Sequence, residues 1–245
     1  MKIAIIPARG GSQRIPRKNI RTFCGKPMIA WSIEAALHSA CFERVIVSTD
    51  DADIAAVAQS CGAEVPFMRP ADLSDHHTPT LPVVAHAIDW AHAQGMTPQA
   101  VCCIYATAPM ITALDVQQSL HTLLSNDCDY VFAATSYAFP IQRAFQLNAQ
   151  HRVEMFDPEH FGTRSQDLPH AYHDAGQFYW GTPAAWLNQT PIFSSRAMAH
   201  LLPRYRVQDI DTPEDWVRAE RMCQSNTQEL PLNKDAHHAT FHISN

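Results

Sequence analysis

The chain has 245 residues, of which 46% are hydrophobic and 17% charged, and its formal net charge at pH 7 is -6. These values are typical of a soluble globular protein, because a general nucleic-acid-binding protein needs a broad basic face and a membrane span needs roughly 18 apolar residues in a row. The seven cysteines show no CxxC spacing, which predicts reduced thiols rather than disulfides or a zinc site. We expect a cytoplasmic protein that binds neither nucleic acid nor membranes, with no signal peptide in the short apolar run before Arg9.

Short apolar runs alternate with helix-like segments up to about residue 135. The predicted strands are Lys2–Ile6, Arg44–Ser48, Ala63–Met68, Ala100–Tyr105 and Tyr130–Thr135. The predicted helices, each starting near a Pro, Thr or Asp, are Pro27–Ser39, Ala52–Cys61, Thr80–Gln94 and Thr112–Leu124. This alternation predicts a Rossmann-like three-layer α/β domain, in which helices cover both faces of a mainly parallel sheet.

The alternation stops between about residues 136 and 181, where aromatic and polar residues mix without a clear period. We expect an inserted lobe there, packed against a second copy of the chain, because exposed aromatic residues are typical of protein interfaces. Regular patterns return after the lobe, so the predicted folded domain spans residues 1–223. Residues 224–245 form a polar tail that we expect to be disordered.

A basic loop, defined as residues 6–21 (IPARGGSQRIPRKNIR), follows the first predicted strand and holds five of the 18 Lys and Arg residues. The loop after the first strand of a parallel sheet is the usual phosphate site. Gly10 and Gly11 lack a Cβ, so they can take positive φ and bring N–H groups close to phosphate oxygens. The loop matches neither the Walker pattern nor G-x-G-x-x-G, which excludes two common phosphate loops. The alternative is a solvated basic loop.

A second cluster of charged residues, Asp209 and Asp211, lies at the end of the predicted strand Tyr205–Ile210, where a predicted helix at residues 211–222 begins. Side chains two positions apart on a strand point the same way, so Asp209 and Asp211 can both reach one Mg²⁺, which prefers carboxylates together with phosphate oxygens and water. The alternative is that Asp211 only precedes the helix and Asp209 is solvated. Together with the basic loop, the pair indicates a metal-bound nucleotide.

These motifs resemble the cytidylyltransferases that activate sialic acid and related nonulosonic acids as CMP-sugars. The similar segments, spread over about residues 1–222, are 6–20 (IPARGGSQRIPRKNI), 25–33 (GKPMIAWSI), 45–51 (VIVSTDD), 69–80 (RPADLSDHHTPT) and 209–215 (DIDTPED). Within the family, 105–109 (YATAP) and 164–181 (RSQDLPHAYHDAGQFYWG) are most similar to enzymes acting on pseudaminic acid in pathways of bacterial surface glycans, such as those of flagellin or capsule.

The resemblance implies a role for individual residues in binding CTP. The triphosphate and ribose would be held by Arg9, Gly10, Gly11, Ser12, Lys18 and Asn19. The cytidine would lie near Arg69, Thr78 and Thr80, and Asp209 and Asp211 would carry Mg²⁺. Gln13 departs from the family, which usually has a basic residue there, and Arg14 would supply the missing charge.

The sugar acceptor in this family is an α-keto acid with a carboxylate beside its anomeric hydroxyl. A guanidinium can grip a carboxylate in two parallel hydrogen bonds, so Arg164 suits it. Further sugar candidates from the same matching are Tyr105, Gln166, Gln177 and Tyr179. Tyr105 stands where sialic acid enzymes tend to have Gln, which disfavours sialic acid as the substrate. The alternative for Arg164 is a surface ion pair with Asp167 or Asp174.

We expect the sugar hydroxyl to attack the α-phosphorus of CTP in line, with Mg²⁺ on the Asp pair and with Arg9 and Lys18 stabilising the pyrophosphate that leaves. The closest alternative is a sister enzyme that makes CMP-sialic acid or CMP-legionaminic acid. A nucleotide-sugar glycosyltransferase is another, because Asp209-Ile210-Asp211 also spells an acidic DxD motif, and a non-catalytic nucleotide sensor is a third. The aromatic lobe and the family resemblance both favour a homodimer.

Overall fold

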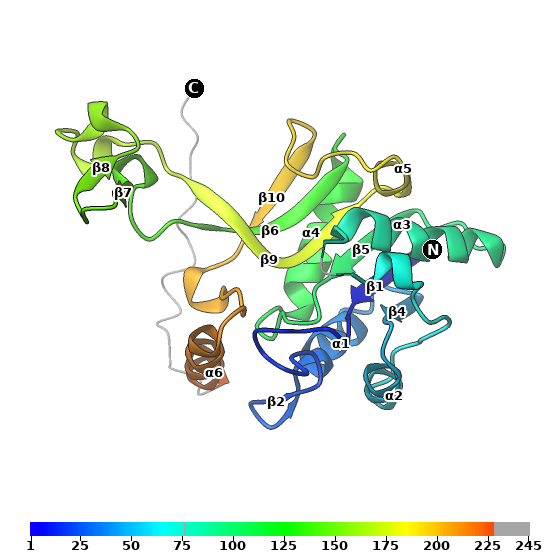
Figure 1. The fold of residues 1–245 in the computed structure, drawn as a ribbon. Coiled ribbons are helices and arrows are strands. Elements are labelled where there is room, and N and C mark those ends of the chain that lie inside the picture. The colour runs from blue at the N-terminus through cyan, green and yellow to red at the C-terminus, as the bar shows by residue number, and fades with distance from the viewer. Residues whose placement is uncertain (76, 228–245) are drawn as a thin grey trace.

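The computed structural model describes residues 1–75 and 77–227. Its central sheet has six strands in the order β10-β6-β9-β5-β1-β4. The strands are β1 (Lys2–Pro7), β4 (Arg44–Ser48), β5 (Ala100–Ile104), β6 (Tyr130–Ser136), β9 (Tyr172–Gly181) and β10 (Ala197–Leu201). β1 pairs in parallel with β4 and β5, and β6 with β10, while β9 runs antiparallel between β5 and β6. The predicted mainly parallel α/β fold is confirmed (Figure 1).

The α-helices are α1 (Met28–His38), α2 (Ala52–Ser60), α3 (Thr80–Ala93), α4 (Ala113–Ser125), α5 (Pro183–Leu187) and α6 (Pro213–Thr227). Two small hairpins add β2 (Thr22–Phe23) with β3 (Lys26–Pro27), and β7 (Phe145–Leu147) with β8 (Val153–Met155). The 3-10 turns are η1 (Ala71–Leu73), η2 (Ile141–Arg143), η3 (Pro158–His160), η4 (Ser165–Asp167) and η5 (Arg204–Arg206). The four long helices predicted before residue 135 are confirmed to within two residues at each end.

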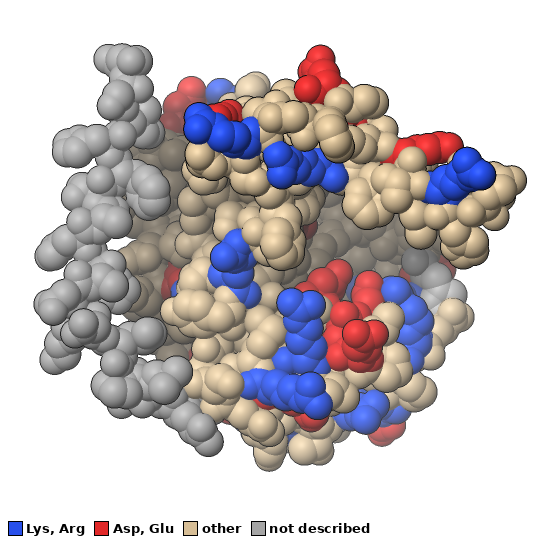
Figure 2. All heavy atoms as spheres, turned by 90° about the vertical axis from the view of Figure 1, so that its left-hand side faces the viewer, with Lys and Arg blue, Asp and Glu red and all other residues tan. Residues whose placement is uncertain are grey.

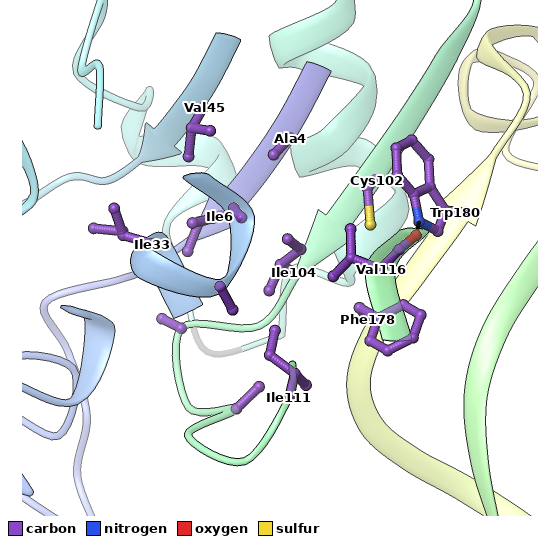
Figure 3. Packing of buried hydrophobic residues seen from close by; sticks show 14 of the residues in the cluster. Ala4, Ile6, Ile33, Val45, Cys102, Ile104, Ile111, Val116, Phe178 and Trp180 are labelled. Atoms are coloured by element: carbon purple, nitrogen blue, oxygen red, sulfur yellow. Dashed lines mark hydrogen bonds between the residues drawn. The ribbon is translucent and has the colours of Figure 1, made fainter. Parts of the chain in front are cut away.

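Strand β1 shows why the domain has three layers. Its side chains alternate between the two faces: Ala4 and Ile6 pack with α1, α2 and α4, whereas Ile3 and Ile5 pack with α3 and α5. A strand buried on both faces reads as a continuous apolar run, and burying each Ile contributes roughly 1.5–3 kcal/mol. In the first cluster (Figure 3), the buried Trp180 donates its indole N–H to the carbonyl of Val116 at 3.1 Å and so ties β9 to α4.

A third hydrophobic cluster fastens the end of the chain to the basic loop. Trp216 on α6 packs edge-on against Phe23, with a ring-centroid distance of 5.3 Å, and the cluster also holds Ile15 of the loop and Ile210. Ile210 is 0% exposed. Because Ile210 faces this core, the flanking residues of the sequence Asp209-Ile210-Asp211 are held beside the loop, about 190 residues away in sequence.

Two predicted strands are wrong. Ala63–Met68 contributes only isolated bridges at Glu64 and Met68, because Pro66 between them has no N–H for a continuous ladder. Tyr205–Ile210 begins inside the 3-10 turn η5 and continues without strand pairing, because Pro203 caps the turn and the side-chain amides of Gln177 and Gln208 bind the carbonyls of Arg206 and Asp209.

The lobe predicted at 136–181 ends too late, since residues 172–181 form the central strand β9. The alternation of buried and exposed residues expected of a strand is interrupted in β9 at Gly176. There φ is +60°, and the pairing of β9 with β6 shifts register between Phe132 and Ala134, so the sequence pattern did not predict this strand. Hairpin β7–β8 lies at the tip of an extension that projects from the body of the molecule (Figure 1). We define the lobe from here on as residues 137–171.

The predicted tail begins inside a helix, because α6 runs to Thr227, and the rest of it lies outside the described residues. All seven cysteines are free thiols, as predicted. Within residues 1–75 and 77–227, no helix combines the length and apolar character that crossing a membrane requires.

Candidate active site

A polar cavity of about 240 Å³, called the main cavity below, lies where β1 and β5 end. The predicted site residues that line it are Arg9, Ser12, Arg14, Lys18, Asn19, Arg69, Thr78, Thr80, Tyr105 and Asp211, together with Gln13. They come from the basic loop, the start of α3, the end of β5 and the segment before α6. Figure 2 shows basic and acidic side chains next to one another on the side of the molecule that carries β2, α6 and the lobe.

The basic loop is anchored at its glycine pair by two carboxylates that follow β4. The Gly10 N–H donates to Asp50 Oδ1 at 2.9 Å, and a Cβ on Gly10 would lie 2.6 Å from Asp51 Oδ2. The reason predicted for this glycine is therefore wrong: Gly10 has no positive φ, and it allows close packing against Asp51. Sequence reasoning missed these carboxylates, although Asp50 and Asp51 follow a predicted parallel strand at the same sheet edge.

Arg17 also serves the anchoring of the loop. It has a positive φ of 57°, and its guanidinium binds Asp51 and Asp53 at the start of α2, at 2.7 Å each. Asn19 is 6% exposed and donates its amide to the Arg9 carbonyl at 3.0 Å, which fixes the backbone beside the main cavity. Of the four other cations of the loop, Arg9, Arg14 and Lys18 line the cavity, whereas the Arg21 guanidinium lies 4.8 Å from the ring centroid of Trp216.

Asp211 joins the basic loop to the last segment before α6. Its carboxylate accepts from Arg14 at 2.8 Å and lies 3.4 Å from Lys18 Nζ, which also donates to the Ile210 carbonyl at 2.6 Å. Asp209 lines a second cavity of about 400 Å³ next to the segment Val207–Asp211, so the two carboxylates face different hollows. Loss of hydration raises the pKa of Asp209, and the negative charge of Asp211 raises it further.

Arg69 is a buried cation at the wall of the main cavity. Its side chain is 4% exposed, and its Nε and Nη2 have no hydrogen-bond partner among the described residues. The closest carboxylate oxygen, Asp50 Oδ1, is 3.6 Å away. Burial lowers the pKa of Arg69, the neighbouring carboxylate of Asp50 opposes this shift only in part, and the charge of Arg9 adds to it. Two donors without partners at a cavity wall indicate that a ligand accepts from them.

Two predicted threonines stand at the start of α3. The Thr78 hydroxyl donates to Asp75 Oδ1 at 2.6 Å, and the Thr80 hydroxyl lies 2.9 Å from the hydroxyl of Tyr105. Tyr179 lies behind Tyr105, with ring centroids 5.2 Å apart. The structure thus brings Tyr105 to the main cavity and makes Tyr179 its buried neighbour.

The other predicted sugar residues are not gathered at the main cavity. Gln177 is 2% exposed and donates its amide to the Arg206 carbonyl at 2.7 Å, so it supports the turn η5 from inside the fold. Arg164 and Gln166 belong to the lobe. Arg164 pairs with Asp167 at 2.7 Å with its side chain 72% exposed, which is one of the ion pairs considered as the alternative.

A mainly parallel α/β sheet with a basic loop after its first strand is an arrangement that nucleotide-binding folds share. The solved structure of CMP:2-keto-3-deoxy-manno-octonic acid synthetase complexed with CTP has the same fold, with a TM-score of 0.68 and 18% identity, covering 92% of this chain and 99% of that one.

The family follows from the sequence comparisons. A family model described as cytidylyltransferase matches residues 3–233. A pseudaminic acid cytidylyltransferase of Campylobacter jejuni subsp. jejuni is 48% identical over 224 residues, which cover 91% of this chain and 97% of the relative. A CMP-N,N'-diacetyllegionaminic acid synthase of Legionella pneumophila subsp. pneumophila is 29% identical over 237 residues, covering 93% and 98%. The chain belongs to the cytidylyltransferase family.

Proposed function

We propose that the protein transfers CMP from CTP to the anomeric hydroxyl of pseudaminic acid and releases pyrophosphate, as a step of bacterial surface glycan synthesis in the cytoplasm. The 48% identity to a pseudaminic acid cytidylyltransferase over nearly the whole of both chains carries the choice of sugar. The relative named for legionaminic acid is less similar, at 29%. Membership of the cytidylyltransferase family disfavours a glycosyltransferase or a non-catalytic sensor.

CTP would occupy the main cavity. Its triphosphate would lie along the basic loop, on the cations Arg9, Arg14 and Lys18 and on Gly11 and Ser12. Its base would lie beside Arg69, Thr78 and Thr80. Two facts support this arrangement: Nε and Nη2 of Arg69 have no hydrogen-bond acceptor among the described residues, and two cations of the loop, Arg14 and Lys18, share the single carboxylate of Asp211.

The acidic pair fits a divalent cation. Asp209 and Asp211 offer the hard oxygen ligands that Mg²⁺ prefers. They face different hollows, so a side chain would turn for both to contact one cation. Burial raises the pKa of Asp209 and the charge of Asp211 raises it further, and a bound cation would offset both effects. We propose that these two residues hold Mg²⁺, which when bound would neutralise phosphate charge and lower the pKa of the attacking hydroxyl. Lys18 contacts Asp211 and the Ile210 carbonyl, so it would keep the pair beside the triphosphate.

In the reaction, the hydroxyl oxygen of the sugar forms a bond to the α-phosphorus while the bond from that phosphorus to the β-phosphate bridge oxygen breaks. The hydroxyl proton passes to solvent, and pyrophosphate leaves with the electron pair. Arg9 and Lys18 would stabilise the negative charge that grows on the leaving group, which is electrostatic catalysis by residues held in place before the reaction.

The sugar acid would approach from the side of the lobe. Its carboxylate would replace Asp167 as the ion-pair partner of Arg164. The Arg164 side chain is exposed, so it can rotate toward the sugar. Gln166 and Tyr105 would contact hydroxyl or acetamido groups, whereas the burial of Tyr179 and Gln177 favours a supporting role for these two. We also propose a homodimer formed through the lobe.

The test is a pyrophosphate-release assay with purified protein, CTP, Mg²⁺ and a panel of pseudaminic, legionaminic and N-acetylneuraminic acids. We expect turnover with pseudaminic acid to exceed turnover with the other two. Asp211→Ala should lose at least about 100-fold in kcat, since it removes a residue that contacts Lys18 and that would hold the metal. Glu214→Ala, an exposed carboxylate just after the pair, is the matched control. Full turnover by Asp211→Ala, or turnover without CTP, would refute the proposal.

A further inference from the structure

We propose that Asp50 acts as a built-in anion: its carboxylate fills a small anion site between Gly10 and Arg69, and so keeps free phosphates away from the part of the main cavity that takes the base. Asp50 then determines specificity, because it favours CTP over inorganic anions such as the pyrophosphate that leaves. The inference rests on the proposed function, which places the base of CTP beside Arg69 and the triphosphate along the basic loop.

A single oxygen of Asp50 contacts both partners. Its Oδ1 accepts from the Gly10 N–H at 2.9 Å, and the same Oδ1 lies 3.6 Å from Arg69 Nη2. The carboxylate therefore connects the loop that would bind the triphosphate with the arginine that would bind the base. The Asp50 side chain is 28% exposed, so an anion from solvent can reach its position once the carboxylate is removed.

The fold brings these groups together at one edge of the sheet. β1 and β4 pair in parallel and end at the same edge, so Gly10, in the loop after β1, meets Asp50, which follows β4 (Figure 1). The chain returns to this edge through an isolated bridge between Thr49 and Met68, and the Thr49 carbonyl accepts from the Arg69 N–H at 2.7 Å. Backbone contacts thus hold the carboxylate close to both of its partners.

The surroundings of the Asp50 carboxylate would attract any other anion. Arg69 is buried, and its Nε and Nη2 have no hydrogen-bond acceptor in the described part of the chain. The positive charge of Arg9 also acts on Arg69, whereas the charge of Asp50 offsets it. A cation beside a backbone N–H binds phosphate oxygens well. If the carboxylate were absent, a phosphate group would find both kinds of donor at this position.

The carboxylate affects CTP and a free phosphate differently. In CTP the ribose connects the base to the triphosphate, so a base beside Arg69 keeps the phosphates on the basic loop. Pyrophosphate has no such connection and can move to the strongest group of donors. Because its oxygens carry full charges whereas cytosine offers only neutral acceptors, an Arg69 without its counter-charge would favour pyrophosphate over the base. Asp50 prevents this by occupying the position itself.

Two substitutions separate the charge of Asp50 from the space that its side chain fills. Asp50→Asn keeps an oxygen for the Gly10 N–H but loses the charge, whereas Asp50→Ala also empties the position. We expect the ratio of the pyrophosphate Kd to the CTP Kd, measured by titration calorimetry on the full chain at one free Mg²⁺ concentration, to fall in both variants. The fall should be about tenfold or more in Asp50→Ala, as for a hydrogen bond to a charged group, and smaller in Asp50→Asn.

Formate tests whether the vacated position is an anion site. It is the smallest carboxylate, so it fits the space that Asp50→Ala leaves and should raise the Kd ratio of this variant toward the wild-type value. Asp50→Asn should not respond, because its amide still fills the position. The wild type and Asp89→Asn, the same chemical change at an exposed position of α3, should keep the same ratio with and without formate.

The outcomes distinguish the two levels of the argument. Wild-type protein that does not bind CTP would refute the proposed function itself. Wild-type protein that binds CTP, with an unchanged ratio in both folded Asp50 variants, would refute the role of Asp50 alone. A lower ratio that formate does not restore in Asp50→Ala would mean that Asp50 only holds the loop, which also contradicts a built-in anion. A lower ratio that formate restores would support it, and if Asp50→Ala does not fold, the ratio in Asp50→Asn decides.

Discussion

Buried guanidinium donors that find no hydrogen-bond acceptor lower the stability of a protein, and Arg69 has two such donors, Nε and Nη2, with Asp50 only at an ion-pair distance of 3.6 Å. Arg44 offers the contrast. It is also partly buried, but its Nε donates to Glu64 Oε1 at 2.9 Å, so its charge is balanced within the fold. At the scale of single residues, the presence or absence of a close carboxylate acceptor distinguishes Arg44, which stabilises the fold, from Arg69, whose donors can bind a ligand.

Arg69→Met should therefore have opposite effects on stability and binding. The variant removes a buried charge and breaks only the 3.6 Å ion pair to Asp50, whose Oδ1 still accepts from the Gly10 N–H, so its melting temperature should equal or exceed that of the wild type. Its Kd for CTP should rise by about 10- to 100-fold, the cost of hydrogen bonds to a charged group. Thermal unfolding and titration calorimetry measure the two quantities.

Arg44→Met is the control for this prediction, because it should lower the melting temperature and leave the CTP affinity unchanged. The interpretation of Arg69 would be contradicted by a variant that binds CTP as tightly as the wild type.

At the scale of elements, one carboxylate holds the segment that carries the acidic pair. Asp115, in the first turn of α4, accepts from Arg206 of η5 at 2.5 and 3.0 Å and lies 3.4 Å from His200 Nε2 of β10. Burial alone would raise the pKa of Asp115, but hydrogen bonds from His200, Arg206 and Thr112 outweigh it and hold the pKa well below its usual range. Because Asp115 holds Arg206 in place, the position of the following residues 207–211 is fixed relative to α4.

Asp115→Asn should lower the free energy of unfolding at pH 7 by about 3 kcal/mol, because it leaves the charge of the mostly buried Arg206 without its partner. The lowered pKa in the folded state means that the unfolded chain takes up the proton first. The stabilisation is therefore complete above the unfolded pKa of about 4 and is lost as the pH falls below it. Urea unfolding of wild type and variant between pH 7 and pH 3 tests both statements.

The difference between wild type and Asp115→Asn should shrink toward pH 3, whereas Asp89→Asn should follow the wild type throughout. A difference that stays constant with pH would mean that the loss comes from packing and not from the charge.

Elements set by local signals could be predicted from the sequence, and elements set by distant partners could not. The apolar run Lys2–Ile6 is buried on both faces, so its pattern alone identifies a central strand. By contrast, Tyr205–Ile210 alternates like a strand, yet its conformation is fixed by Arg206 binding Asp115, which is 91 residues away. The sequence predicted that Asp209 and Asp211 point the same way, but only Asp211 lies at the basic loop, where buried Ile210 holds the segment, whereas Asp209 faces the second cavity.

At the scale of the whole molecule, the lobe is too apolar for a surface that faces water alone. Its aromatic residues Phe139, Phe161, Phe156 and Phe145 are 82%, 79%, 67% and 55% exposed. Exposed apolar groups of this kind mark protein interfaces, and most oligomers formed from one chain are symmetric dimers. The lobe also carries Arg164, outside the main cavity, so a partner in contact with the lobe would restrict the access of the sugar to that arginine.

We therefore expect a dimer in sedimentation velocity at micromolar concentration, and a shift to monomer in the double variant Phe139→Ser and Phe161→Ser. Phe193→Ser, which changes an aromatic residue outside the lobe that is 66% exposed, is the control and should remain dimeric. Because the serines remove apolar area from the lobe surface and leave the buried core intact, the double variant should keep its CTP affinity while it dissociates. A wild-type monomer would exclude the dimer, and a dimeric double variant would place its interface elsewhere on the molecule.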